Sequence, residues 1–424
     1  MMPTFSFVVI AYNVGRYIER CIYGLRHQTL NDFETIIVDD ASTDDTYARI
    51  IKAIDGDDRF TVIRKSMNEG AHLARKTGAL RSTGRYVVFV DGDDELSPIF
   101  CETMMPLLRA RQNDIIRFGR VVLADHLADM ETAYANERMF NVSMTLPENG
   151  ILPAMFSDEA PTRITWSIID CVFRGDFVRR CFAMMTDKHL GRTQDSYQMF
   201  VLCALAESMS FVTDFRGLRY HLGTGVSGRS RESVERFAGM QSAVKGNLEA
   251  VLGFIAEHGE RPVEVACGQW LHGEYLRIVG NEWVTRLAHQ DQGEGLRVIV
   301  RTWGAADALA ALLDPLTARA QWLCNQTGVA SRDDELYLWL PLYAELSRQL
   351  DDATILGEKR EHLQLLLDDL REREQEVLRE RQRLERERIL REGSIRRKVI
   401  DGLLPEGTPR RELLNAVVKY IRHR

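Results

Sequence analysis

Apolar and polar positions alternate in a regular rhythm along the first hundred residues. Short apolar runs predict buried strands at 5–10, 35–38, 60–64 and 86–90. Between them, apolar residues at three- and four-residue spacing predict helices at 17–27, from about Thr43 and at 71–80, with Ser42 or Thr43 as the N-cap of the second helix. Strands that alternate with helices predict an α/β domain with a largely parallel sheet, whose ligands bind at the carboxyl ends of its strands.

The rest of the chain has a different pattern. Residues 119–228 are mixed, whereas 232–349 have the apolar spacing of helices and contain five tryptophans, which we interpret as core residues. From Leu356, apolar residues recur every seven positions to Leu384 within a dense mixture of Arg and Glu. This pattern predicts a long charged helix. Because the second apolar position of each heptad is mostly charged beyond Leu370, a coiled-coil oligomer and a single solvated helix both stay open.

The last segment predicts a basic amphipathic helix. Residues 396–424 hold eight Arg or Lys against three acidic residues, and 410–424 place apolar side chains on one helical face. Such a helix can lie on an anionic membrane surface, or it can pack on its own protein. The patterns together divide the chain into four parts: an α/β domain at 1–230, a helical domain at 231–350, a charged helix at 351–392 and a basic tail at 393–424.

Composition and charge narrow the class of protein. The 424 residues are 45% hydrophobic and 28% charged, and the net charge of −7 argues against general nucleic-acid binding. The seven cysteines are scattered, which indicates reduced, mostly buried thiols. We find no signal-peptide pattern and no apolar run of membrane-spanning length. We therefore expect a cytoplasmic protein, with any membrane contact peripheral, on the inner face of the plasma membrane.

The strongest chemical signal is an acidic cluster after the fourth predicted strand. Val87–Val90 lead into Asp91, Gly92, Asp93 and Asp94, where the glycine lets backbone approach closely. Crowded carboxylates repel one another unless a cation neutralises them, and hard oxygen ligands suit Mg²⁺ or Mn²⁺. An acidic turn that only caps the next helix would have the same sequence.

Two earlier strand ends carry groups that suit a nucleotide. Asp39 and Asp40 can accept hydrogen bonds from a base or a ribose, and Tyr12 and Asn13 end the first strand with an aromatic face and an amide. The sequence also supplies cations near the same edge, namely Arg64, Lys65, Arg75 and Lys76. Three neighbouring strand ends of this kind favour one shared site.

These segments together resemble the family 2 inverting glycosyltransferases of the GT-A fold. The residues that carry the resemblance are Phe5–Asn13, Gln28–Glu34, Ile36–Asp44, Asn68–Gly70 and Phe89–Asp94. The match is dense over the first 100 residues and continues thinly to about residue 230. It implies a Rossmann-like nucleotide-sugar-binding domain, followed here by the helical domain and the charged helix, in an enzyme of the hexosyltransferase type.

The resemblance also implies roles for single residues. Tyr12 and Asp40 would contact the base of the donor, with Asn13, Asp39, Arg64 and Lys65 nearby. Asp91, Gly92 and Asp93 match the motif that binds the metal and the ribose-diphosphate, with Asp94 beside them. Asp195 would be the catalytic base, although Gln194 stands where many relatives carry Glu. An N-cap role for Asp195 is the alternative. His221, before a Gly-rich loop, could be a third metal ligand or a diphosphate contact.

The same resemblance leaves the pathway open. Ile10 replaces the Pro usual in the first motif, and the Gln-x-x-Arg-Trp motif of processive relatives does not occur. We expect a nucleotide-sugar donor, with a UDP-sugar as the first candidate, and a polysaccharide or lipid-linked acceptor. The pathway that we expect is the synthesis of a cell-surface polysaccharide or glycoconjugate. Two alternatives are an oligomeric scaffold with a decayed transferase domain and a nucleotidyltransferase. The second would normally have a Gly-rich phosphate loop after its first strand, where this chain has Ala11–Gly15.

Overall fold

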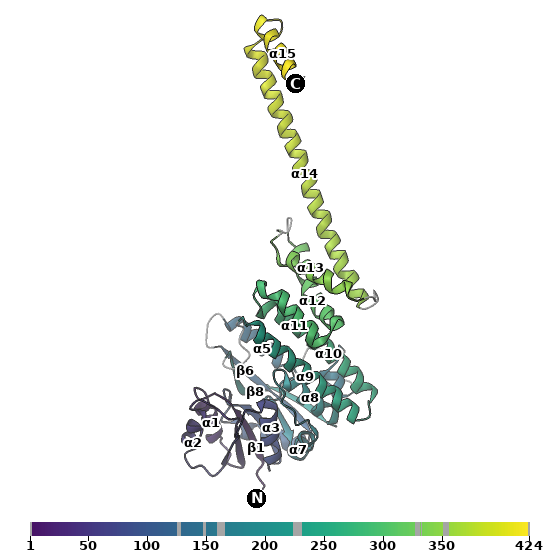
Figure 1. Cartoon of the computed structure of the whole chain (residues 1–424). Coiled ribbons are helices and arrows are strands. Elements are labelled where there is room, and N and C mark those ends of the chain that lie inside the picture. Colours follow the sequence, from purple (N-terminus) through teal and green to yellow (C-terminus); the bar gives the residue numbers. More distant parts are fainter. Residues whose placement is uncertain are drawn as a thin grey trace. The chain divides into compact units, whose positions relative to one another are not determined.

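The computed structural model describes residues 2–124, 129–146, 150–158, 166–223, 231–326, 331, 333–350 and 356–422. The chain forms two compact units, 1–311 and 312–424. Figure 1 shows strands gathered in the N-terminal part of the chain and helices in the rest. The predicted four-part division at residues 230, 350 and 392 stays a prediction.

The first half of the sheet is parallel, as predicted. Its strands lie in the order β3-β2-β1-β4, with β1 at Phe5–Ala11, β2 at Phe33–Asp39, β3 at Phe60–Arg64 and β4 at Tyr86–Asp91. The connecting helices are α1 (Ile18–Arg26), α2 (Thr46–Ile54) and α3 (Gly70–Arg81). Strands β1 and β4 are buried almost throughout, which explains their continuous apolar sequence. Their carboxyl ends meet at one edge of the sheet.

The second half of the sheet mixes directions. It continues as β4-β7-β6-β8-β5, with β5 at Glu95–Leu96, β6 at Ile115–Ala124, β7 at Cys171–Arg174 and β8 at Met209–Leu222. Strand β7 is antiparallel to both neighbours, β6 and β8 are parallel, and β5 is antiparallel to β8. Five helices belong to this half: α4 (Phe100–Ala110), α5 (Met130–Phe140), α6 (Ile151–Met155), α7 (Gly175–Met184) and α8 (Gln194–Leu205).

Helix α2 begins three residues later than its sequence predicts. The Asn13 Oδ1 atom accepts hydrogen bonds from the backbone N–H of Thr43 and of Asp44, at 2.8 and 3.3 Å. The Ser42 hydroxyl accepts one from the backbone N–H of Asn13. Because these bonds hold the segment in a loop, neither Ser42 nor Thr43 caps the helix, and the prediction of that N-cap was wrong.

Helices follow the sheet in the first unit. They are α9 (Val234–Glu257), α10 (Pro262–Arg286) and α11 (Gln292–Trp303), with a 3₁₀ turn at His289–Asp291. Helix α12 (Ala305–Cys324) leads into the second unit. Trp283, Trp303 and Trp339 are buried, as expected of core residues, whereas Trp322 is exposed. All seven cysteines are free and six of them are buried, which confirms the expected thiols.

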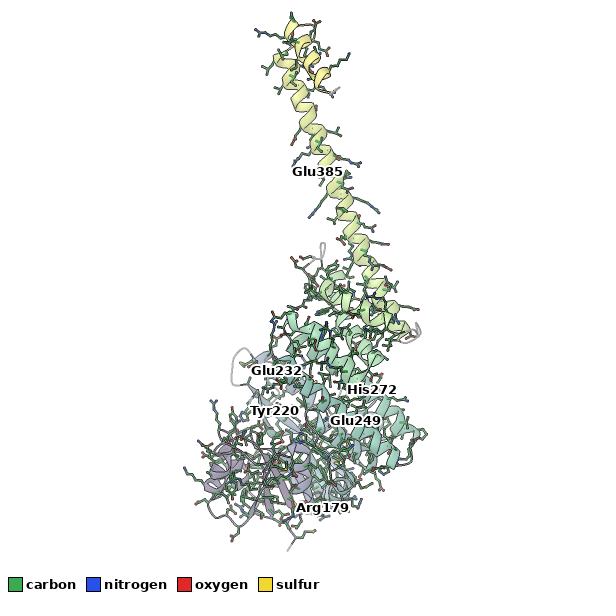
Figure 2. The ribbon with its side chains drawn as sticks, in the orientation of Figure 1. Arg179, Tyr220, Glu232, Glu249, His272 and Glu385 are labelled. Atoms are coloured by element: carbon green, nitrogen blue, oxygen red, sulfur yellow. The ribbon has the colours of Figure 1, made fainter. Side chains whose placement is uncertain are left out.

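The second unit contains α13 (Glu335–Arg348), the 47-residue α14 (Gly357–Leu403) and α15 (Pro409–Arg422). The first part of the predicted apolar stripe, Leu363, Leu367 and Leu370, is buried. Beyond it Val377 and Leu384 are exposed, and Figure 2 shows side chains around Glu385 projecting from the helix. Pairs three or four residues apart, such as Arg383 with Glu380, support this part as a charged helix. Among the described residues, no helix combines the length and apolarity needed to cross a membrane.

Candidate active site

The acidic cluster lies where β4 ends beside β1. Asp91 is the last residue of β4 and is paired in register with Ile10. The backbone N–H of Gly92 donates to the carbonyl of Ile10 at 2.9 Å, and a Cβ at Gly92 would lie 3.0 Å from that oxygen. Glycine therefore lets the turn fold tightly over the end of β1.

Negative charge is concentrated in this turn. Burial raises the pKa of the Cys21 thiol well above its ordinary value, and Asp94, Asp93 and Asp91 add to the effect. Asp94 is almost fully buried, and its own pKa is raised well above the ordinary value by burial and by its two neighbours. The crowded carboxylates of the turn thus repel one another, and a bound cation would relieve that repulsion.

Asp94 and His221 join this turn to β8. The Asp94 Oδ1 atom accepts a hydrogen bond from the backbone N–H of His221 at 2.9 Å. The imidazole Nε2 of His221 lies 2.8 Å from Glu95 Oε1. The structure therefore brings His221 to the acidic cluster, with its ring against Glu95.

Arg75 links the cluster to the predicted base. This α3 side chain is 2% exposed, and it donates from Nη2 to Asp91 Oδ1 at 2.8 Å and from Nη1 to Asp195 Oδ1 at 2.7 Å. A planar guanidinium can hold two carboxylates in one fixed geometry, which an ammonium cannot do. The sequence indicated Arg75 only as one of several cations near this edge. The one sequence signal for its role is that it lies in α3, the helix directly before β4.

Asp195 lies in the first turn of α8 and keeps access to solvent. Its side chain is 35% exposed, and that of Asp91 is 29% exposed, so a substrate can reach both. Burial of much of the group raises the pKa of Asp195 above its ordinary value, Arg75 opposes this shift, and Asp91 adds to it. A carboxylate with a raised pKa is a better proton acceptor near neutral pH.

Arg120 is a second buried cation near the site, and no pattern in the sequence indicated it. Arg120 is 1% exposed and shares Asp170 Oδ2 with Arg117, at 2.7 and 3.0 Å respectively. Its guanidinium lies 3.8 Å from the ring centre of Phe140. Burial is the main reason why the pKa values of Asp94 and Asp195 are raised, and the charge of Arg120 opposes that rise in both.

The predicted nucleotide-binding residues gather at the ends of β1, β2 and β3. Tyr12 is 46% exposed, which leaves its ring available for stacking. Asp39 is fully buried, with its Oδ2 atom 3.3 Å from Arg64 Nε. These residues lie on adjacent strand ends, as predicted.

Asn13, Asp40 and Lys65 are largely engaged with the protein. Asn13 holds the loop before α2, as described above. The two oxygens of Asp40 accept hydrogen bonds from the backbone N–H groups of Glu69 and Gly70, at 3.1 and 2.7 Å, at the start of α3. Lys65 Nζ lies 2.5 Å from Glu69 Oε2 and 3.7 Å from Asp40 Oδ1. Asp40 therefore holds the N-terminus of α3, the helix that carries Arg75.

The donor set around Asp91 and Asp93 suits a hard divalent ion. Within the described residues, no group of three or more His, Cys, Asp or Glu side chains is arranged to hold a metal by itself. Mg²⁺ and ions like it are commonly bound by one or two carboxylates together with water and substrate phosphates. The pair Asp91 and Asp93 fits that mode.

Comparisons with known proteins point to one family. The sequence model described as "Glycosyl transferase family 2" matches residues 6–166. EpsJ of Bacillus subtilis, an uncharacterized glycosyltransferase, is 30% identical over 46% of this chain and 55% of its own length. TuaG of Bacillus subtilis, a putative teichuronic acid biosynthesis glycosyltransferase, is 38% identical over 22% of this chain and 37% of its own length. The chain thus spans less than two thirds of either relative.

A solved structure supports the fold. The structure of S. aureus TarS 1-349 in complex with UDP-GlcNAc has a TM-score of 0.51 at 17% identity, covering 84% of this chain and 92% of that one. This likeness concerns the fold alone. The family match and the relatives agree: residues 6–166 of this chain belong to a family 2 glycosyltransferase domain, and the sheet that carries the acidic cluster at its edge has the GT-A fold.

Proposed function

We propose that this protein transfers a sugar from a nucleotide-diphosphate sugar, preferably a UDP-sugar, to a hydroxyl acceptor with inversion at the anomeric carbon. The observation that carries the proposal is the link through Arg75 between Asp91 of the acidic motif and Asp195. A donor-binding group and a candidate base are thereby held in one site. Asp195 is paired across the fold rather than acting only as a helix cap.

Asp195 is the general base of this proposal. Its carboxylate removes the proton from the acceptor hydroxyl while that oxygen attacks the anomeric carbon from the face opposite the nucleotide. Its raised pKa suits this task, and its partial exposure leaves room for an acceptor. Arg75 fixes the direction of the carboxylate relative to the donor.

Asp91 and Asp93 would hold the Mn²⁺ or Mg²⁺ ion, with Asp94 and His221 as further candidate ligands. When bound, the ion would supply electrostatic stabilisation of the charge that develops on the departing nucleoside diphosphate. The buried carboxylate of Asp94, whose Oδ2 atom has no hydrogen-bond partner among the described residues, supports a cation here. His221 would have to share its imidazole between the ion and Glu95.

Four residues would bind the nucleotide, and three more would shape the loops around it. Tyr12 would stack on the base, Asp39 and Arg64 would meet base and ribose, and Gly92 would let the diphosphate approach the backbone, with Asn13, Asp40 and Lys65 shaping the loops around them. The UDP-GlcNAc bound by TarS supports a UDP-sugar as the first donor to test.

The acceptor would be a growing polysaccharide or a lipid-linked glycan. The name of TuaG supports a role in cell-surface polymer synthesis. The exposed apolar and basic residues of α15 support peripheral contact with the inner face of an anionic membrane, and the exposed residues Val377 and Leu384 on α14 would allow a homo-oligomer.

A donor screen tests the proposal. The full chain would be incubated with UDP-, GDP- and dTDP-sugars in Mn²⁺, Mg²⁺ or EDTA, and released nucleoside diphosphate would be measured. We expect metal-dependent release from at least one UDP-sugar. A well-folded chain that releases nucleoside diphosphate from none of these donors, with or without candidate acceptors, would overturn the proposal.

A further inference from the structure

A buried series of hydrogen bonds leads from Arg75 through Gln198 and His72 to the backbone of Thr186. His72 is fully buried on α3, one turn before Arg75, and Gln198 is fully buried on α8, one turn after Asp195. The imidazole Nε2 of His72 lies 2.9 Å from the carbonyl oxygen of Thr186, and its Nδ1 lies 3.1 Å from Gln198 Nε2. Gln198 Oε1 in turn lies 3.3 Å from Arg75 Nη1.

The direction of every bond in this series is fixed from both ends. A guanidinium only donates, so Gln198 must present its amide oxygen to Arg75 and its NH₂ group to His72. A carbonyl only accepts, so His72 must carry its proton on Nε2 to donate to Thr186. Its Nδ1 is then the acceptor that the Gln198 NH₂ requires. The two requirements agree on one tautomer and one amide orientation.

We propose that His72 and Gln198 are positioning residues that fix the plane of the Arg75 guanidinium and, through it, the carboxylate of Asp195. This inference rests on the proposed function, because Asp195 is taken as the base. Nη1 of Arg75 is shared between Asp195 and Gln198, whereas Nη2 binds Asp91. The neutral amide supplies a third acceptor without adding negative charge, so the positive charge of Arg75 stays directed at the two carboxylates.

The surroundings of His72 keep its imidazole neutral, which the hydrogen bond from Gln198 to Nδ1 requires. Burial lowers the pKa of His72 to about 4, the carbonyl of Thr186 opposes the shift, and Lys76 and Arg75 lower the pKa further. The charged and titratable groups that face it are those two cations on α3, Asp187 on the loop before α8, and Tyr197 of α8, whose ring centre lies 5.6 Å away. Above about pH 5 the imidazole therefore remains an acceptor at Nδ1.

The matched control is Lys76. Lys76 lies on α3, like His72, and it holds the loop that contains Thr186 by donating to the carbonyl of Met185 and to Asp187, at 2.6 Å each. It takes no part in the hydrogen bonds that link Arg75, Gln198 and His72. Lys76→Met thus removes a loop anchor and leaves the contacts of Arg75 in place. A loss that reflects only loosening of the loop would appear equally in Lys76→Met and in Gln198→Met.

The activity test compares pH profiles of kcat for the full chain and these variants. In Gln198→Met we expect kcat to fall about tenfold, with the donor KM changed less than about twofold. The acidic limb should move to higher pH, because an Arg75 guanidinium that is no longer held in its plane opposes the rise in the pKa of Asp195 less strongly. His72→Asn, which keeps an acceptor for Gln198, should retain more of kcat than His72→Leu. A folded Gln198→Met with the wild-type limb, or the same shift in Lys76→Met, would overturn the inference.

A second readout does not depend on transferase activity. Nitrogen-15 NMR of histidine-labelled protein, with the His72 signal assigned by its loss in His72→Asn, reports the tautomer directly. We expect a neutral ring protonated on Nε2 at pH 6. A proton on Nδ1 would overturn the inference even if the enzyme is active. The expected tautomer in a chain without activity would instead count against the proposed function alone.

Discussion

Asp91 and Asp195, which lie far apart in the sequence, accept hydrogen bonds from the two Nη atoms of the same arginine, at 2.8 and 2.7 Å. Asp91 ends the central strand β4. Asp195 lies in the first turn of α8, which comes after β7 and before β8 in the sequence. The buried Arg75 between them sets the distance from the acidic motif to the proposed base. This geometry leads to the first prediction.

Replacing Arg75 by lysine should lower kcat strongly. Lysine keeps the charge but cannot hold two carboxylates in a planar fork, so we expect Arg75→Lys to lose about 100-fold in kcat. Arg179→Lys is the matched control, since Arg179 donates to the carbonyls of Ser82 and Gly84, at 3.3 and 3.1 Å, rather than to the site. Steady-state kinetics on both variants test the prediction, and equal losses in the two would contradict it.

The sequence predicted the parallel half of the sheet because each buried strand there is a continuous apolar run between helical patterns. It could not predict β7, whose direction depends on pairing with β4 and β6 and leaves no local periodicity. It also misplaced the start of α2, because the side chain that holds the preceding loop, Asn13, lies about thirty residues earlier.

The site was predicted in the same uneven way. Asp91, Asp93 and Asp195 were proposed as site residues because they stand in segments that resemble motifs of the family, and they remain predictions. Arg75 was seen as a nearby cation, but its bonds to both carboxylates arise only when α3 and α8 pack together. Arg120 looks in the sequence like any charged residue of a strand, although the fold buries it completely.

The pH dependence of turnover should reflect the environment of Asp195. Burial raises its pKa above the ordinary value of 3.8, and a base must be deprotonated to act. Activity should therefore rise with pH through this pKa, which places the acidic limb of kcat above the ordinary pKa of an aspartate. Rate measurements from pH 3 to 8 in the presence of saturating donor test this, and a limb at or below pH 3.8 would be inconsistent with it.

Stability should fall in acid because His72 is buried in its neutral form. Its pKa is about 4 in the folded chain against an ordinary 6.5, so between these values the unfolded chain binds the proton and the folded chain does not. The contribution is complete above pH 6.5 and is lost as pH falls towards 4, amounting to at most about 3 kcal/mol.

Urea unfolding at pH 7 and at pH 4.5 measures this loss. His72→Asn cannot take up the proton and should lose less stability over the same interval. The same loss in wild type and variant would show that other groups are responsible.

The tail should bind anionic vesicles if it contacts membrane. Leu413 is 71% exposed and Val418 is 44% exposed on α15, with Arg410 and Lys419 also exposed. We expect the full chain to co-sediment with vesicles containing phosphatidylglycerol at low salt, and the double variant Arg410→Glu, Lys419→Glu to bind far less. Absence of wild-type binding at low salt would remove the membrane proposal while leaving the transferase proposal intact.

The central claim, that Asp195 is the base of an inverting transferase, is tested most directly by Asp195→Asn. The amide can still accept a hydrogen bond from Arg75 but cannot take the acceptor proton, so kcat should fall by about 100-fold or more while the Kd of the donor, measured by calorimetry, changes little. Circular dichroism and thermal unfolding would establish that the variant is folded. Wild-type turnover in a folded Asp195→Asn protein would contradict the account.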